Sequence, residues 1–250
     1  MIGDLGGAAA LVTGGSRGIG AAIVTALCDA GAGVVFTASA PSREAERLAA
    51  ECRERFGVRC ELLVADQSDA SGAGAAVQRA AGLLGSLGIV VANAGVSVWW
   101  PLTDRPVPEA ELERQLAVNL VGTTAVVRAA ARTLPRDGRI IVIGSTAAQQ
   151  VGMRGLADYA AGKAALAGFV RGAAWDLAPR GITVNLVQPG HVETRLNPGT
   201  RESHERVRAR TALGRFGRPE EIAAGVVFLA SPSASYITGA SLNIDGGATA

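Results

Sequence analysis

The sequence has 250 residues, of which 48% are hydrophobic and 18% are charged, and its formal net charge is +2. A chain of this length and composition buries a large core, which excludes a disordered tail. Nucleic-acid binders usually carry a basic stripe, and this sequence has no run of like charges. The most basic stretch, Arg201 to Arg218, also contains Glu202 and Glu205, which indicates a solvated helix face. We therefore predict no nucleic-acid partner.

Cysteine, histidine and hydropathy patterns exclude further classes. Cys28, Cys52 and Cys60 are far apart and show no metal-ligand or redox spacing, which predicts buried thiols in a reducing compartment. The two histidines are too few for a metal site or a Ser–His pair, so we predict no metal. The first apolar run, Ala8–Val12, is too short for a signal peptide or a membrane span. These features predict a cytoplasmic protein without a membrane partner.

Short apolar runs alternate with longer amphipathic or alanine-rich segments along the whole chain. The runs are apolar nearly throughout, as expected of parallel strands covered on both faces. The predicted strands are Ala8–Thr13, Gly33–Ala38, Arg59–Ala65, Gly88–Ala92, Gly138–Gly144, Gly181–Val187 and Ser241–Ile244. The predicted helices are Gly18–Ala30, Ser42–Phe56, Ser71–Ser86, Glu109–Leu134, Ala157–Ala178 and Pro219–Ser231. This alternation predicts one α/β domain over residues 1–250, with a doubly wound parallel sheet of about seven strands and helices on both faces.

A glycine-rich turn, residues 13–20, joins the first predicted strand to the first helix. Its glycines at positions 14, 18 and 20 allow a tight turn, close approach of a pyrophosphate and close packing of the helix on the sheet. The helix N-terminus then offers free N–H groups and a positive dipole to phosphates. A plain strand-to-helix turn could use the same glycines. The position after the first strand and before a helix favours a dinucleotide site in a Rossmann-type sheet.

Three later groups of residues are candidates for the site, two at the ends of predicted strands and one within a predicted helix. Asn93-Ala94-Gly95 closes the fourth strand, and Ser145 ends the fifth at the same edge of the sheet. Tyr159 and Lys163 are four residues apart in a predicted helix, so they share a face. A lysine ammonium beside a phenol stabilises the phenolate and lowers its pKa from about 10. In isolation this spacing more often marks a surface pair, so its meaning depends on the other motifs.

Taken together, these motifs resemble the short-chain dehydrogenase/reductase family over essentially the whole chain. The matching positions are Thr13-Gly14 with Gly18 and Gly20, Asp66, Asn93-Ala94-Gly95, Asn119, Ser145, Tyr159 with Lys163, Pro189-Gly190 with Val192 and Thr194, and Asn243–Gly247. Two common family residues are replaced, by Ala92 and Gly162, and both changes leave the catalytic groups intact. The nearest general likeness within the family is to 3-oxoacyl-acyl-carrier-protein reductases.

The resemblance implies an oxidoreductase that moves a hydride between a nicotinamide dinucleotide and a small carbonyl or alcohol substrate. Tyr159 would be the proton donor in reduction, and Lys163 would lower its pKa and hold the nicotinamide ribose. Ser145 would bind the substrate carbonyl, and Asn119 would hold a water in a proton relay toward Lys163. The implied cofactor residues are Gly14, Ser16, Arg17, Gly18, Ile19, Gly20, Ala38, Ser39, Asp66 at the adenine, Asn93 at its ribose, Ala94, Gly95, Tyr159, Lys163, Pro189, Gly190, and Val192 with Thr194 at the carboxamide.

The end of the second strand predicts NADPH or NADP+ as the cofactor, with NADH possible. NAD-preferring sites place an acid about 20 residues after the glycine turn, but here Ala38 takes that position and no acid follows until Glu44. Arg17 matches the basic residue that NADP-using relatives direct at the 2′-phosphate, and Ser39 and Arg43 could add donors. The alternative is that Arg17 points to solvent and the site accepts both cofactors.

Substrate and partner features are less specific. Trp99-Trp100 would wall an apolar pocket or pack on a helix, and residues 193–217 would form a substrate lid. Arg136 and Arg180 match the positions where the reductases dock an acidic carrier protein, although arginines there also cap helices. The family resemblance predicts a homotetramer through the helices at 109–134 and 157–178. Small residues there could instead serve close packing on the sheet.

Three functions remain open from the sequence. The favoured one is an NADPH-dependent reductase of a ketone or a 3-oxoacyl thioester. The second is an alcohol dehydrogenase acting on a secondary metabolite or a sugar alcohol, because direction follows cofactor ratios. The third is a non-catalytic nucleotide-binding regulator, but such proteins typically lose the tyrosine or the lysine, and this chain keeps both.

Overall fold

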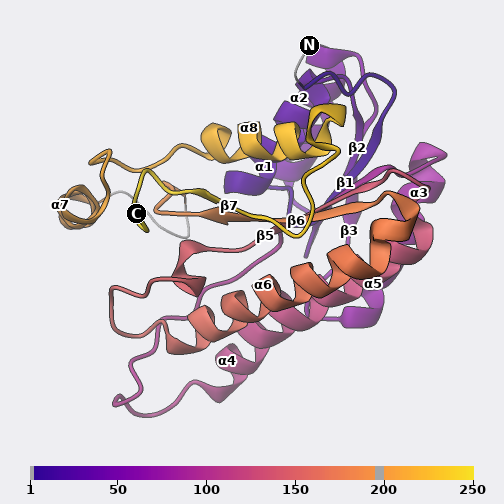
Figure 1. The fold of residues 1–250 in the computed structure, drawn as a ribbon. Helices are drawn as coiled ribbons and strands as arrows, with labels where there is room; N and C mark the ends of the chain where they lie inside the picture. Colours follow the sequence, from indigo (N-terminus) through magenta and orange to yellow (C-terminus); the bar gives the residue numbers. More distant parts are fainter. Residues whose placement is uncertain (1–2, 195–199) are drawn as a thin grey trace.

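The computed structural model describes residues 3–194 and 200–250. All seven predicted strands form, and they lie in one parallel sheet of order β3-β2-β1-β4-β5-β6-β7 (Figure 1). The strands are β1 (Ala9–Val12), β2 (Gly33–Ala38), β3 (Cys60–Val64), β4 (Ile89–Ala92), β5 (Arg139–Ile143), β6 (Thr183–Pro189) and β7 (Ser241–Ile244). The predicted Rossmann-type architecture is confirmed.

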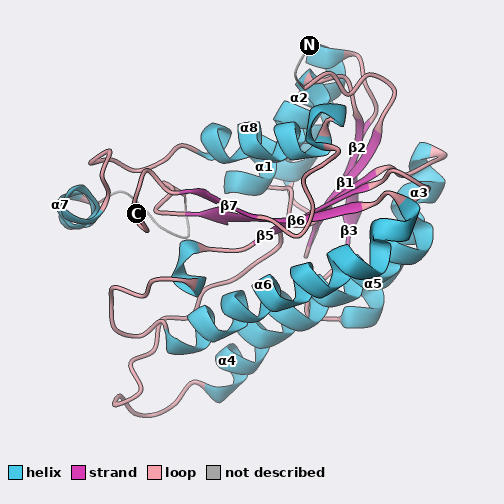
Figure 2. Ribbon diagram, viewed as in Figure 1, coloured by secondary structure: helices cyan, strands magenta, loops and turns pink. Residues whose placement is uncertain are grey.

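Helices cover both faces of the sheet, and each face has its own hydrophobic core (Figure 2). One face carries α1 (Gly18–Asp29), α2 (Arg43–Phe56) and α8 (Pro219–Ala230). The other carries α3 (Ala70–Leu84), α4 (Glu109–Leu116), α5 (Thr123–Thr133) and α6 (Ala157–Leu177). A further helix, α7 (Arg201–Arg210), lies beyond the carboxyl ends of the strands, near the C-terminus. Among the described residues, no helix is long and apolar enough to cross a membrane.

The strand order creates a switch point between β1 and β4. The chain moves from β1 to β2 and β3 on one side, then returns to β4 and continues outward on the other side. Loops at the carboxyl ends of β1 and β4 therefore leave in opposite directions and open a crevice, which is where ligands bind in open α/β sheets.

The predicted helix over 109–134 is wrong in one respect, because a π-helical segment, Ala117–Gly122, separates α4 from α5. A Cβ atom at Gly122 would clash with the carbonyl oxygen of Gln67, so the chain comes unusually close to the segment after β3. π-Helical turns within α-helices often occur at functional sites. This one carries Asn119, one of the predicted catalytic residues.

The sixth strand begins two residues later than predicted and runs on to Pro189. Gly181, its predicted start, has a φ of +69° and ends the preceding helical turn in the left-handed conformation. That conformation favours glycine and is incompatible with a strand. The extended end of β6 brings Pro189 to the carboxyl edge of the sheet.

Candidate active site

A cleft of about 970 Å³ runs along the carboxyl edge of the sheet at the switch point. Every predicted site residue except Asn119 lines it. The lining members of that set are Gly14, Ser16, Arg17, Gly18, Ile19, Gly20, Ala38, Ser39, Asp66, Asn93, Ala94, Gly95, Ser145, Tyr159, Lys163, Pro189, Gly190, Val192 and Thr194. Residues far apart in the sequence thus meet in one cavity large enough for a cofactor and a substrate.

The glycine-rich turn requires glycine at several positions, as Gly14 and Gly20 show. Gly14 has a φ of +63°, and a Cβ atom there would lie 2.7 Å from the Cα of Ala94. A Cβ atom at Gly20 would clash with the carbonyl oxygen of Gly14. Side chains at these positions would push β4 and α1 away from the turn, so glycine shapes this part of the cleft.

The N-terminus of α1 faces the cleft without a competing acceptor. Its N-cap residue, Arg17, makes no side-chain cap, and the first turn contains no acid. Its first N–H groups are therefore available to phosphate oxygens, and the helix dipole favours negative charge there. Thr194 lies across from this turn, with its Cγ2 atom 3.4 Å from where a Cβ of Gly18 would be. The turn, the free helix end and the cleft fit a dinucleotide.

Hydrogen bonds tie the turn after β1 to the turn after β4. The Thr13 hydroxyl accepts from the backbone N–H groups of Asn93 and Ala94, each at 3.1 Å. The Asn93 amide donates to the carbonyl oxygens of Thr13 at 2.9 Å and Gly14 at 3.0 Å. Asn93 lines the cleft as predicted, but these bonds occupy its amide N–H groups. Its side chain therefore shapes the cleft as well as facing it.

Ala38, Ser39 and Asp66 line one end of the cleft, which the sequence resemblance assigns to the adenine and which is called the adenine end below. The Asp66 carboxylate accepts from the N–H and hydroxyl of Ser68, each at 2.9 Å, and these bonds help hold its pKa below the ordinary value. Within the described residues, the Arg17 guanidinium makes no hydrogen bond or ion pair, and it is exposed at the cleft.

Of two charged residues at the start of α2, one lines the cleft and the other does not. Arg43 is exposed and does not line the cleft, so the structure does not support it as a donor to the cofactor. Glu44 does line the cleft. It stands in the first turn of α2, past the end of β2 where NAD-preferring sites carry their acid.

Ser145, Tyr159 and Lys163 come together at the other end of the cleft. The Ser145 hydroxyl hydrogen-bonds the Tyr159 phenol. The Lys163 Nζ lies 5.9 Å from the centre of the Tyr159 ring and donates to the carbonyl oxygen of Ile143 at 3.0 Å. Helix α6 places the phenol and the ammonium on one face, as their spacing predicted.

Burial controls the pKa values of Tyr159 and Lys163. It raises the pKa of the Tyr159 phenol, against the opposing hydrogen bond from Ser145. It also lowers the pKa of Lys163, which is 4% exposed, to about 8. Lys163 does not lower the pKa of Tyr159 as expected, because desolvation of the phenol dominates. A phenol that remains protonated at neutral pH is suited to donate a proton.

Asn119 lies directly behind the cleft and is almost fully buried. Its amide Oδ1 accepts from the N–H of Val96 at 2.9 Å, and its Nδ2 donates to the Val96 carbonyl at 2.8 Å. The Asn119 Oδ1 and the Lys163 Nζ lie 3.3 and 3.6 Å from the position of a Cβ at Gly95. Because residue 95 is glycine, the space between the Asn119 amide oxygen and the Lys163 ammonium stays open. The proton relay itself stays a prediction.

The two tryptophans separate in the structure. Trp99 lines the cleft, is 59% exposed, and donates its indole N–H to the carbonyl oxygen of Arg154. Trp100 does not line the cleft, and its buried indole nitrogen has no hydrogen-bond partner among the described residues. The pocket interpretation therefore holds for Trp99 alone.

Sequence reasoning missed part of the lining beyond Tyr159. His191, Arg206 and Arg210 face the cleft there, together with Ala248 and Thr249 near the C-terminus. The interpretation of residues 201–218 as a solvated helix face is wrong for Arg206 and Arg210. A usable signal was their spacing of four residues, which places both on one face of a helix.

The arginines considered for carrier docking lie elsewhere. Arg180 donates to the carbonyl oxygens of Ala131 and Leu134 at the end of α5, and Arg136 donates to Pro179 at 3.2 Å. These contacts lie near the amino end of β5, opposite the cleft. They favour the helix-capping interpretation.

The three cysteines are closer together than their spacing suggested. Their sulfur atoms lie within 4.8 Å of one another, buried between α1, α2 and the start of β3. None of them lines the cleft. The absence of a metal stays a prediction.

Comparison with known proteins agrees with the fold. A family model described as enoyl-(acyl carrier protein) reductase matches residues 14–249. The chain is 38% identical to the cyclic-di-GMP-binding biofilm dispersal mediator protein of Escherichia coli (strain K12), over 96% of each chain. It is 36% identical to a 3-oxoacyl-acyl-carrier-protein reductase of Aquifex aeolicus (strain VF5), over 96% of this chain and 97% of that one. A short chain dehydrogenase structure from Burkholderia cenocepacia J2315 in complex with NADP is 41% identical, with a TM-score of 0.94 over 99% of this chain and 100% of that chain.

The fold and these matches define an NAD(P)-dependent oxidoreductase that acts on CH–OH or C=O groups. Within that class, the chain belongs to the short-chain dehydrogenase/reductase family. The resemblance found in the sequence is thereby confirmed.

The buried lysine predicts the pH dependence of reduction. We expect kcat/KM to be constant near neutral pH and to fall as the pH rises through about 8, where Lys163 loses its charge. The Tyr159 phenol, with its raised pKa, stays protonated over this range. In Lys163→Arg, any remaining activity should lose this falling limb, because a guanidinium stays protonated. A wild-type profile that rises through pH 8 would contradict this assignment.

Proposed function

We propose that the protein is an NADPH-dependent reductase that converts a ketone or a 3-oxoacyl thioester to the secondary alcohol. One observation carries this proposal. Ser145, Tyr159 and Lys163 lie together at one end of a cleft, and the glycine-rich turn forms the other end. A reduced nicotinamide bound in this cleft supplies the hydride.

The residues then have separate roles. The substrate oxygen accepts hydrogen bonds from the Ser145 hydroxyl and the Tyr159 phenol. As the carbonyl carbon gains the hydride, the Tyr159 proton moves to the developing alkoxide. Lys163 stabilises the resulting phenolate, and solvent returns a proton to it through the region of Asn119. A positioned acid of this kind contributes about 10²–10⁴-fold to the rate, and orientation in the cleft contributes further.

Two alternatives have weaker support. An alcohol dehydrogenase would use the same groups in reverse, with the Tyr159 phenolate as the base. The ratio of reduced to oxidised cofactor would then set the direction of the reaction. A regulatory protein that only binds a nucleotide would not need Tyr159 and Lys163 placed beside Ser145. The name of the Escherichia coli relative describes cyclic-di-GMP binding for that protein.

The function is tested with a panel of ketones, 3-oxoacyl thioesters and secondary alcohols, followed by the absorbance of the reduced nicotinamide. We expect reduction of at least one carbonyl class, and Tyr159→Phe should lower kcat about 10²–10⁴-fold while leaving the Kd for NADPH nearly unchanged. Tyr236→Phe is the matched control, because Tyr236 is fully exposed. Near-wild-type kcat in Tyr159→Phe would refute the assigned chemistry. NADPH binding without turnover on any substrate would favour the regulator.

The preference for NADPH is supported by the adenine end of the cleft. Ala38 leaves room where an acid would repel a 2′-phosphate, and Arg17 has an uncommitted guanidinium there. Ser39 is exposed beside them. The Glu44 carboxylate, which also lines the cleft, opposes a phosphate. NADH use at lower efficiency is compatible with this arrangement.

The ratio of kcat/KM for NADPH to that for NADH tests this preference. Arg17→Ala should lower the ratio about ten- to a hundredfold, the value of a charge-assisted hydrogen bond. Ala38→Asp should also lower it. Arg43→Ala is the control and should leave the ratio unchanged, because Arg43 does not line the cleft. A wild-type enzyme that already favours NADH would end this part of the proposal.

We further propose that residues 1–250 act as one domain, that residues 193–217 include a substrate lid, and that the protein is cytoplasmic. Positions 195–199 of that lid lie outside the described residues.

The proposed homotetramer has support on the outer face of α6. Gly168 and Gly172 are exposed there, and a Cβ atom at either would meet nothing within 4 Å. An exposed glycine in a helix costs about 1 kcal/mol relative to alanine, and none of the residues that the structure describes packs against either glycine. Trp175 is 83% exposed on the same helix, and Leu116 and Val121 are exposed nearby. A partner helix would bury these groups.

Light scattering at micromolar concentration should therefore give four times the chain mass of 25.3 kDa. Trp175→Glu should reduce that mass, because burying a carboxylate between helices is unfavourable. The control, Ala50→Glu on the exposed face of α2, should leave the mass unchanged. A wild-type mass equal to one chain would contradict assembly.

A further inference from the structure

The substrate end of the cleft has a basic wall on one side and an apolar wall on the other. Trp99, Met153 and Leu156 line the apolar side. His191, Arg206 and Arg210 line the basic side. Neither wall takes part in the proton chemistry of Tyr159. Their composition therefore bears on which substrates the cleft accepts.

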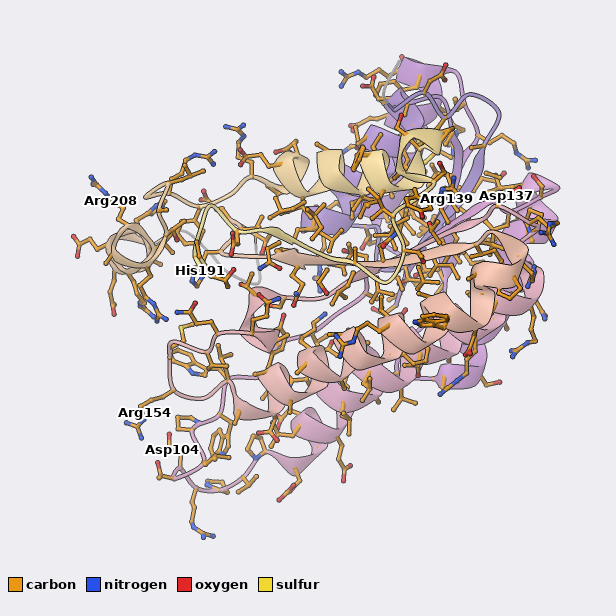
Figure 3. All side chains as sticks on the ribbon, viewed as in Figure 1. Asp104, Asp137, Arg139, Arg154, His191 and Arg208 are labelled. Carbon is orange, nitrogen blue, oxygen red and sulfur yellow. The ribbon has the colours of Figure 1, made fainter. Side chains whose placement is uncertain are left out.

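Helix α7 directs two of its arginines at the cleft. Arg206 and Arg210 are half-buried and four residues apart, so they share a face, while the buried Val207 anchors the helix. The Arg210 guanidinium donates to the carbonyl oxygen of Gly152, and an Arg206 Nη1 lies 4.0 Å from the sulfur of Met153. Both guanidinium groups thus lie against the loop that forms the opposite wall. Arg208 is exposed and points away from the molecule (Figure 3).

The positive charge at this end is not balanced by the cleft itself. Burial, Arg210 and Arg206 together lower the pKa of His191, so both guanidinium groups act on the same space. Of the described residues that line the cleft, the acids are Glu44 and Asp66, and both lie at the adenine end. Glu202 pairs with Arg206 at 3.3 Å, but its side chain is 88% exposed. Exposed ion pairs of this kind are weak.

From this geometry we infer that Arg206 and Arg210 form an anion subsite that binds a carboxylate or phosphate on the substrate. This inference rests on the proposed reductase function. The preferred substrates are then carbonyl compounds that carry an anionic group beyond a short apolar body. Guanidinium groups suit this role, because their planar N–H groups pair with two oxygens of a carboxylate or phosphate.

Matched substrate pairs test the subsite. The 3-, 4- and 5-oxo acids are compared with their methyl esters, and dihydroxyacetone phosphate with dihydroxyacetone. The wild type should show a higher kcat/KM for the anion in at least one pair, mainly through a lower KM. A preference for the oxo acids over their esters indicates a carboxylate subsite, and a preference for dihydroxyacetone phosphate over dihydroxyacetone indicates a phosphate subsite.

Variants on one helix then locate the effect. Arg206→Gln and Arg210→Gln should each lower the ratio of kcat/KM for anion to that for neutral partner about ten- to a hundredfold. Arg208→Gln, on the same helix but directed away from the cleft, should leave the ratio unchanged. Arg206→Glu should invert it in favour of the neutral substrate. The ratio is measured within one variant, so a loss of folded protein does not imitate the effect.

The outcomes separate this inference from the function on which it rests. A wild type that reduces acids and esters equally, and both members of the phosphate pair equally, overturns the subsite and leaves the reductase standing. An Arg208→Gln variant that lowers the ratio as far as Arg210→Gln also overturns it. A wild type that reduces no carbonyl compound overturns both proposals.

Discussion

Thr13 and Asn93 join the carboxyl ends of β1 and β4 through four hydrogen bonds, two to the Thr13 hydroxyl and two from the Asn93 amide. These two strands are neighbours in the sheet, but their following loops leave in opposite directions. Without such a connection, the crevice between the loops would have no fixed shape. Each buried polar group is satisfied by its partner, so breaking one bond would leave another group unpaired at a cost of about 1–3 kcal/mol.

This connection sets the position of everything else in the cleft. The Gly14 backbone is held against Ala94, so the free N-terminus of α1 faces the space between the two loops. Two residues after Ala94, the backbone of Val96 is hydrogen-bonded to both the amide oxygen and the amide nitrogen of Asn119. The Lys163 Nζ lies close by, 3.6 Å from the position of a Cβ at Gly95. The groups that we propose for phosphate binding and for proton transfer therefore form one continuous set of neighbours.

The sequence predicted the strands well because the buried parallel strands are apolar nearly throughout. All but one of the predicted site residues line the cleft, although they make up less than half of its lining. It could not predict the π-helical break at Ala117–Gly122, where Gly122 comes into close contact with Gln67, 55 positions earlier. It also missed Arg206 and Arg210, because a helix charged on most sides looks solvated until the fold turns one side inward. The raised pKa of Tyr159 likewise depends on burial, which spacing to Lys163 does not report.

We propose that this cleft brings a bound nicotinamide and a substrate carbonyl into direct contact beside Tyr159. Transfer of an isotope label tests it most directly. A ketone that the enzyme reduces is incubated in ordinary water with NADPH that carries deuterium at the transferring C4 position. Deuterium should then appear on the carbinol carbon of the product, as measured by mass spectrometry and NMR. The hydroxyl proton should come from solvent. A reduced product that carries no deuterium on that carbon would contradict direct hydride transfer in this site.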